Sequence, residues 1–177
     1  MKGKKIKKGF TLIETIMYFS ITAIILITVG SLVINIYNAK KMQQSSDSVN
    51  HNARFILNFI ANRVHNVDYM EDVSPAIEKL LFYTSSTSRF SITLESDKLV
   101  YRQSDDQGGG FPAQSSVTPV ILNSSNISVS GLTLQSLTNN AGVANKGVEI
   151  GFTLTTAATV DPLRYLQQTY QTFISIR

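Results

Sequence analysis

The chain contains no cysteine among its 177 residues. Without cysteine it cannot form disulfide bonds, bind zinc through thiolates or use a thiol nucleophile. We therefore expect its globular part to be held together by packing alone. With 43% hydrophobic and 16% charged residues, the chain suits an apolar anchor and one modest globular domain rather than two independent domains.

Basic residues are scarce outside one end of the chain. The formal net charge is +4, but five lysines precede Phe10. These are Lys2, Lys4, Lys5, Lys7 and Lys8. Without them the basic and acidic residues nearly balance, so no basic face remains for binding phosphates. We therefore expect no nucleic-acid partner.

Charge and proline are both absent from Thr15 to Ala39. At about 1.5 Å of rise per helical residue, this stretch exceeds the roughly 30 Å hydrocarbon core of a bilayer. We expect residues 10–39 to form a transmembrane helix that contacts cytoplasmic membrane lipids. The lysines before it favour a cytoplasmic N-terminus and an extracytoplasmic domain over residues 40–177. No convincing A-x-A cleavage site follows the apolar stretch.

The residues that lead into this stretch, KKGFTLIET from Lys7 to Thr15, resemble the prepilin leader of the type IV pilin superfamily. The family pattern is a basic leader, Gly, Phe-Thr-Leu-Ile-Glu and a long apolar helix. The resemblance implies that residues 1–9 are a leader peptide and that prepilin peptidase cleaves between Gly9 and Phe10. It also implies N-methylation of the new amino terminus at Phe10. Glycine suits a protease subsite that the backbone must approach closely.

Glu14 lies at the edge of the expected membrane span. A charged carboxylate inside a bilayer costs on the order of 2.5 to 3.5 kcal/mol on insertion scales, so it needs a partner or a function. The resemblance implies that Glu14 recruits the Phe10 amine of an adjacent subunit during filament assembly. The structural alternative is that Glu14 reaches the lipid headgroups or stabilises the helix N-terminus electrostatically.

The span differs from that of many major pilins, which carry a helix-bending proline near its middle. This chain has Gly30 and Ser31, and glycine costs roughly 1 kcal/mol of helix propensity, so we expect a local weak point there. Hydroxyl groups in the span either contact other helices or bond to their own backbone. They belong to Thr15, Ser20, Thr22 and Thr28.

An apolar stripe continues beyond the span at spacings of three and four residues, which predicts a helix with one buried face. Its members are Val49, Ala53, Ile56, Ile60, Val64 and Val67. We predict one helix from about Thr11 to Val67. A bend or fraying is expected in residues 43–52, because serine and asparagine side chains compete there for backbone hydrogen bonds.

Past residue 67 the apolar period changes to two, which is typical of strands. Residues 90–94 and 99–103 form a predicted hairpin around a turn at Ser96-Asp97. Further strands are predicted between Asn, Ser, Gly and Pro residues. They cover residues 120–122, 127–129, 132–137, 148–156 and 170–176. Strands after one amphipathic helix favour an antiparallel sheet packed on that helix, so the predicted fold class is α+β.

Three later segments, ARFILNFIANRVHNVDYM, KLVYRQ and YQTFISIR, resemble those of minor pilins and J-type pseudopilins. This resemblance implies a structural subunit, not an enzyme. It would assemble with other pilin or pseudopilin subunits into a type IV pilus or a type II secretion pseudopilus. The alternatives are a major pilin, or a membrane-tethered extracytoplasmic domain that binds a ligand or acts as an enzyme.

Metal-binding candidates are few. His51 and His65 lie about 21 Å apart along the predicted helix, too far to share a metal. Asp105 and Asp106 offer oxygen ligands, but residues 104–112 lack the spaced acidic ligands of an EF-hand. A mobile hairpin loop is the favoured interpretation of that segment. We expect no metal and no cofactor.

Other functional motifs are also weak. The three glycines of residues 108–110 are not followed by Lys-Ser/Thr, so phosphate binding is poorly supported. Asn123 and Asn126 match glycosylation acceptors, but so short a pattern arises by chance. No Ser-His-Asp order or carboxylate pair stands out as a hydrolase site. We expect no catalytic residue.

Replacing Gly9 with leucine should block processing. The leucine side chain would fill the subsite that the glycine backbone is expected to approach. The check is to express wild type and Gly9→Leu with the cognate peptidase and compare their molecular masses. Equal cleavage before Phe10 in both proteins would contradict the predicted junction.

Overall fold

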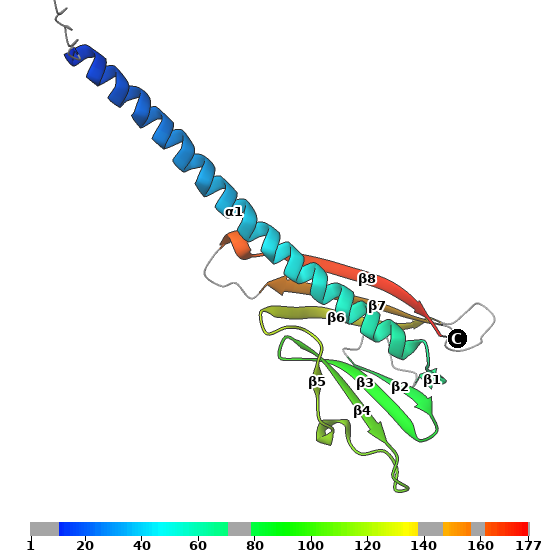
Figure 1. Cartoon of the computed structure of the whole chain (residues 1–177). Helices are drawn as coiled ribbons and strands as arrows, with labels where there is room; N and C mark the ends of the chain where they lie inside the picture. Colours follow the sequence, from blue (N-terminus) through cyan, green and yellow to red (C-terminus); the bar gives the residue numbers. More distant parts are fainter. Residues whose placement is uncertain (1–10, 71–78, 138–146, 157–161, 177) are drawn as a thin grey trace, which may run out of the picture. The chain divides into compact units, whose positions relative to one another are not determined.

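The computed structural model of the protein describes residues 11–70, 79–137, 147–156 and 162–176. It divides into two compact units, residues 1–41 and 42–177, and each is described by itself. One helix, α1 (Leu12–Val64), supplies the described part of the first unit and the beginning of the second (Figure 1). We call residues 12–41 the apolar half of α1 and residues 42–64 its domain half.

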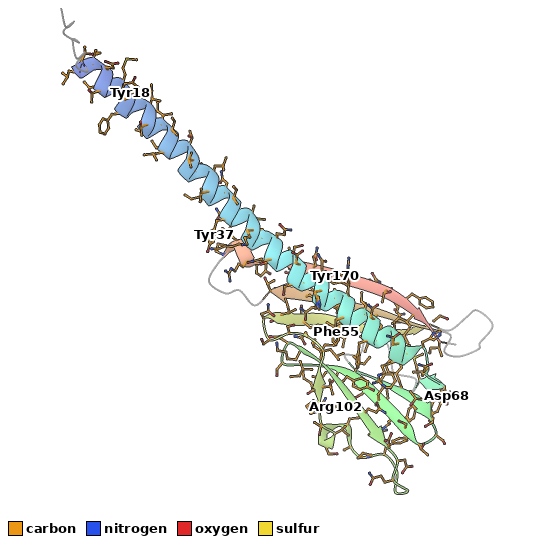
Figure 2. The ribbon with its side chains drawn as sticks, viewed as in Figure 1. Tyr18, Tyr37, Phe55, Asp68, Arg102 and Tyr170 are labelled. Carbon is orange, nitrogen blue, oxygen red and sulfur yellow. The ribbon has the colours of Figure 1, made fainter. Side chains whose placement is uncertain are left out.

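The apolar half of α1 is exposed on all sides. Every residue from Thr11 to Tyr37 is exposed, and Figure 2 shows Tyr18 and Tyr37 projecting away from the helix. By length and composition α1 can cross a membrane, and none of its most apolar window is buried in the protein. The predicted weak point at Gly30 does not interrupt the helix.

The domain half of α1 has one buried face. Its buried residues are Val49, Asn52, Ala53, Ile56, Ile60 and Val64, which confirms the predicted stripe. The fraying predicted for residues 43–52 is wrong, because this stretch is helical throughout. Its polar side chains bond within the helix: the Asn52 amide donates to the Ser48 carbonyl at 2.9 Å. The amide of Asn50 donates to Ser46 Oγ at 3.3 Å.

The strands of the second unit form two antiparallel sheets. The first has the order β1-β2-β3-β4-β5 and the second the order β6-β7-β8. Their bounds are β1 (Tyr69–Met70), β2 (Lys79–Ser85), β3 (Ser88–Glu95), β4 (Lys98–Asp105), β5 (Val120–Ile121), β6 (Ile127–Leu137), β7 (Gly147–Thr156) and β8 (Gln167–Ser175). Two short 3-10 helices, η1 (Gln114–Ser116) and η2 (Pro162–Arg164), lie in the connections. The predicted α+β class is confirmed, with two sheets in place of the single predicted sheet.

The β3–β4 hairpin is the predicted one. Its turn places Ser96 at φ 46° and Asp97 at φ 63°. Both central residues of a type I′ turn need positive φ, which matches the twist of the two strands. Leu94 pairs with Leu99 on either side of this turn.

The predicted strands differ from the observed ones at β6 and β2. Residues 127–129 and 132–137 were predicted as separate strands, yet β6 is continuous and its register shifts between Ser130 and Thr133. Gly131 accommodates this bulge at φ 59°, where a side chain would be strained. The sequence analysis also missed β2, because its apolar residues do not alternate: Phe82 and Tyr83 are both buried.

A single hydrophobic core lies between the domain half of α1 and both sheets. Ile56 and Ile60 of α1, Phe82 and Phe90 of the first sheet, and Ile150 of the second are each at most 1% exposed. The rings of Phe82 and Phe90 stack at 4.7 Å between centroids. Burying one such side chain contributes about 1.5 to 3 kcal/mol, so the helix and the sheets stabilise one another.

Arg102 holds a buried polar cluster on the opposite face of β3 and β4, since strand residues alternate between faces. Its guanidinium is salt-bridged to Glu95, and its Nε donates to the Val117 carbonyl at 3.2 Å. The hydrogen bond to Glu95 raises the pKa of Arg102, and arginine is charged at neutral pH even without that shift. Ser91 Oγ donates to the Gln114 side chain at 2.7 Å. These bonds fasten the segment between β4 and β5 to the sheet.

Replacing Ile60 with aspartate should strongly destabilise the second unit. Ile60 is 0% exposed, and an unpaired buried charge costs several kcal/mol or forces local unfolding. Thermal unfolding of the purified protein should show a lower melting temperature. Asn58→Asp, at an exposed position on the same helix, is the matched control and should change the melting temperature little. Equal melting temperatures for Ile60→Asp and wild type would contradict the described core.

Candidate assembly site

The first turn of α1 places Glu14 at the third helical position after Thr11. Thr11 Oγ1 accepts a hydrogen bond from the Glu14 backbone N–H at 3.4 Å. The Thr15 backbone N–H donates to the Thr11 carbonyl at 3.2 Å. The spacing Thr-x-x-Glu is that of a capping box, in which the glutamate side chain also reaches back toward the cap. The sequence analysis missed this box, although its spacing is visible in Thr11-Leu-Ile-Glu14.

Glu14 is exposed. Its carboxylate lies in the first turn of α1, where the positive end of the helix dipole favours negative charge. In the structural alternative, the Glu14 carboxylate therefore serves as part of the N-terminal cap of α1. Gly9 and Phe10, the predicted cleavage site, lie outside the described residues.

A shallow hollow lies on α1 directly after Glu14. It is lined by Thr15, Tyr18, Phe19 and Thr22, whose spacing places them on one face of a helix. The hydroxyl of Thr22 donates to the Tyr18 carbonyl at 2.7 Å, so this hydroxyl is satisfied within the helix. The face beside Glu14 therefore combines two small side chains with two aromatic rings, and the small side chains allow close helix contacts in a membrane.

The other hydroxyl groups of the span also bond to their own backbone. Thr15 Oγ1 donates to the Thr11 carbonyl at 3.3 Å, and Ser20 Oγ to the Ile16 carbonyl at 2.9 Å. Thr28 Oγ1 donates to the Ile25 carbonyl at 2.8 Å. Of the two uses proposed for these hydroxyls, the described helix adopts the bond to its own backbone.

The histidine and aspartate candidates form no metal site in the described part of the chain. His51 and His65 are both exposed, and no three metal-binding side chains cluster among the described residues. Asp106 Oδ1 accepts the backbone N–H groups of Gly108 and Gly110, both at 2.8 Å. These glycines have φ of 92° and 94°, so the carboxylate stabilises a glycine turn.

Asn123 and Lys98 bind the segment that joins the two sheets. Asn123 is 5% exposed, and its Oδ1 accepts the Leu99 N–H at 2.9 Å. Its amide nitrogen donates to the Ile127 carbonyl at 2.5 Å. Lys98 Nζ donates to the same Ile127 carbonyl at 3.2 Å and to the Ser124 carbonyl at 3.3 Å. Asn123 is buried and hydrogen-bonded, so it cannot accept a glycan in the folded protein. The asparagine at this position serves instead to hold the segment between the sheets.

The same segment is bonded to the domain half of α1. Asn52 Oδ1 accepts the Ser124 backbone N–H at 2.9 Å, and the Asn126 amide donates to Ser48 Oγ at 3.3 Å. On the second sheet, the Tyr170 hydroxyl donates to Asn50 Oδ1 at 3.0 Å. Burial raises the pKa of Tyr170, and a tyrosine hydroxyl is protonated at neutral pH even without that shift. We call these contacts, with those of Asn123 and Lys98, the polar junction.

One feature of the sequence indicates the polar junction. Asn52 lies three residues after Val49 and therefore on the apolar stripe, where an asparagine needs a hydrogen-bond partner. Its partner, the segment after Ile121, is distant in the sequence. Nothing in the composition of either segment identifies the other, so the pairing depends on the folded structure.

Comparisons of the chain with protein-family models, with curated proteins and with solved structures found no match. The resemblance of the leader therefore rests on the residues KKGFTLIET themselves.

Replacing Asn123 with alanine should lower the free energy of unfolding by roughly 1 to 3 kcal/mol, because it leaves the buried Leu99 N–H without its partner and leaves the Ile127 carbonyl only the longer bond from Lys98. Chemical denaturation of the purified protein measures this change. The exposed Asn126 makes one long contact to Ser48, so Asn126→Ala is the control and should cost less than about 1 kcal/mol. Equal effects from the two substitutions would show that Asn123 does not hold the polar junction.

Proposed function

We propose that the chain is a minor pilin or pseudopilin, a membrane-anchored subunit that prepilin peptidase processes and that assembles into a type IV pilus or a type II secretion pseudopilus. One observation carries the proposal: KKGFTLIET leads directly into a helix whose apolar half is exposed on all sides. A secretory signal would be removed after its apolar segment. Cleavage before Phe10 removes the lysines and retains that segment.

Cleavage would also give Glu14 a partner. The new amine at Phe10 is cationic, and a carboxylate four residues away on the same helix lies near it. In a filament the carboxylate of one subunit would instead pair with the Phe10 amine of its neighbour. Such a pair is strengthened by the low dielectric of the membrane and opposed by the desolvation of both groups. The pair therefore favours assembly only where the geometry brings both groups together.

The surroundings of Glu14 support a contact between helices. The hollow formed by Thr15, Tyr18, Phe19 and Thr22 begins one residue later on the same helix. In lipid, helices associate by close packing and by polar contacts, because there is no hydrophobic drive between them. A neighbouring helix that fills this hollow would lie close to the Glu14 carboxylate. The role proposed for Glu14 is thus to select a partner subunit whose N-terminal helix packs against this face.

The extracytoplasmic domain of the proposed subunit is the second unit. Its α+β fold, with the domain half of α1 buried against two sheets, is compatible with a pilin-like subunit. A major pilin is the first alternative. A membrane-tethered binding or enzymatic domain is the second, and it requires no cleavage before Phe10.

Substitutions at Glu14 separate assembly from helix capping. Glutamine can replace glutamate in a capping box, so Glu14→Gln removes the charge and keeps the cap, whereas Glu14→Ala removes both. If the charge recruits a neighbour, both variants should co-purify with the other pilin-like subunits at least tenfold less than wild type. Cleavage and membrane abundance should stay normal, because Glu14 lies beyond the cut site and its loss removes an insertion cost.

The measurement is co-purification after solubilisation, with cleavage and abundance followed by immunoblotting of the same cells. Normal co-purification of Glu14→Gln together with a defect in Glu14→Ala would assign Glu14 to the helix cap. Normal co-purification and filament formation in both variants would place Glu14 among residues that the membrane edge merely tolerates. Either result contradicts the proposed ion pair.

A further inference from the structure

β8 is the longest strand edge that no described segment covers. The outer strands of the first sheet, β1 and β5, have two residues each. The outer side of β6 meets the β3–β4 turn near the start of the strand, where the Val129 N–H donates to the Asp97 carbonyl at 2.9 Å, which leaves a shorter uncovered stretch than that of β8. β8 has nine residues and is the last strand of its sheet. Figure 1 shows no strand of the described residues beyond it.

The sequence of β8 does nothing to protect this edge. Its residues, QQTYQTFIS, include no lysine, no proline and no charged residue. Its pairing with β7 runs from Gln167 to Ser175 without a register shift, so no bulge turns the edge away. Native proteins protect exposed edges by short strands, charges, prolines or bulges. A long regular edge without these devices is suited to pairing with another strand.

A groove runs along this edge. It has a volume of about 760 Å³ and lies between the C-terminal turns of α1 and residues 172–175 of β8. Leu57 and Ala61 contribute apolar surface, and both are partly buried against the core. Asn58 and Asn62 contribute exposed amides one helical turn apart. A strand added to β8 would therefore have one face on α1, as the existing strands of this sheet do.

We propose that β8 and this groove bind an extended, uncharged segment of a neighbouring subunit, which adds to the second sheet as a further strand. The identity of the donor as a subunit rests on the proposed function. The binding chemistry does not, because a strand edge presents alternating N–H and C=O groups that another strand satisfies at a spacing of 4.7–4.9 Å.

The neutral lining of the groove determines which side chains the bound segment can carry. Among the described residues, the groove is lined by no Asp, Glu, Lys or Arg, so a charged side chain entering it would lose water without gaining an ionic partner there. Apolar side chains would contact Leu57 and Ala61. Amides and hydroxyls would pair with Asn58 and Asn62. The bound face of the segment is thus apolar or neutral polar, which resembles the faces of β8 itself.

An antiparallel pair of β8 strands from two copies fits the membrane anchor poorly. Figure 1 shows the domain half of α1 and β8 running in the same direction. Antiparallel pairing of two β8 strands would therefore place the two residue-42 ends at opposite ends of the pair. The apolar half of α1 is joined to the second unit at residue 42 in each copy, so the two points of attachment would lie at opposite ends of the pair. This favours a segment of a different subunit over a second β8.

The test uses the full chain in lipid nanodiscs and a synthetic peptide GVQIGFTLTT, which is the β7 sequence with glutamine in place of Glu149, followed by two solubilising lysines and a fluorophore. β7 is the natural probe, because it already pairs with β8 through the other edge of that strand. Fluorescence anisotropy should show saturable binding. Hydrogen exchange of the β8 amides should become slower when the peptide is bound.

Two separate proline substitutions at adjacent positions test whether the outer edge of β8 binds the peptide. Neighbouring residues of a strand direct their N–H groups to opposite sides, so one of Gln171→Pro and Thr172→Pro removes a bond to β7 and the other removes an outward N–H. The variant that loses a bond to β7 should have a lower melting temperature. The variant that loses an outward N–H should keep the wild-type melting temperature and bind the peptide at least tenfold more weakly. Asn62→Lys should also weaken binding at least tenfold by bringing a charge into the groove, whereas Gln44→Lys, exposed elsewhere on α1, should not.

Absence of saturable binding to wild type would overturn the proposal, and so would unchanged affinity in Asn62→Lys. Peptide-independent dimers that Asn62→Lys dissociates would assign the edge to a second copy and would also overturn it. None of these measurements needs cleavage or a filament. A chain that binds the peptide but is never cleaved before Phe10 would refute the filament proposal and leave the peptide site standing.

Discussion

The structure depends on one helix that meets two different surroundings. The apolar half of α1 exposes hydrophobic side chains on every side, whereas the domain half buries one stripe and exposes the rest. A helix satisfies its backbone hydrogen bonds internally, so it alone can pass from lipid into a protein core without leaving polar groups unpaired. Everything else in the second unit is arranged around the buried stripe.

Polar contacts decide how the sheets meet this helix. The stripe provides most of the burial, but apolar contacts have little directional preference. The polar junction supplies direction, because Asn52 binds the segment between the sheets and Asn123 binds that segment to the β3–β4 hairpin. The serine and asparagine residues that weaken the intrinsic helix propensity of residues 43–52 also make the hydrogen bonds that orient the sheets on the helix.

Local patterns predicted much of this fold. The stripe from Val49 to Val64 and the turn at Ser96-Asp97 were found because their periods and turn residues are contained in short segments. β2 was missed because both of its faces are covered, which removes the alternation. The division into two sheets was missed because it depends on contacts distant in the sequence. Of the candidate site, Glu14 was found from its cost in a membrane, while its place in a capping box was not recognised.

The mature amino terminus is the feature in which the proposed processing would be seen most directly. The intact mass and N-terminal sequence of the protein, purified from the membranes of its own cells, test that processing without any substitution. The account predicts a chain that begins at Phe10, carries one added methyl group on its amine and retains the whole apolar half of α1. A chain that begins at Met1, or one cut after the apolar half, would contradict it.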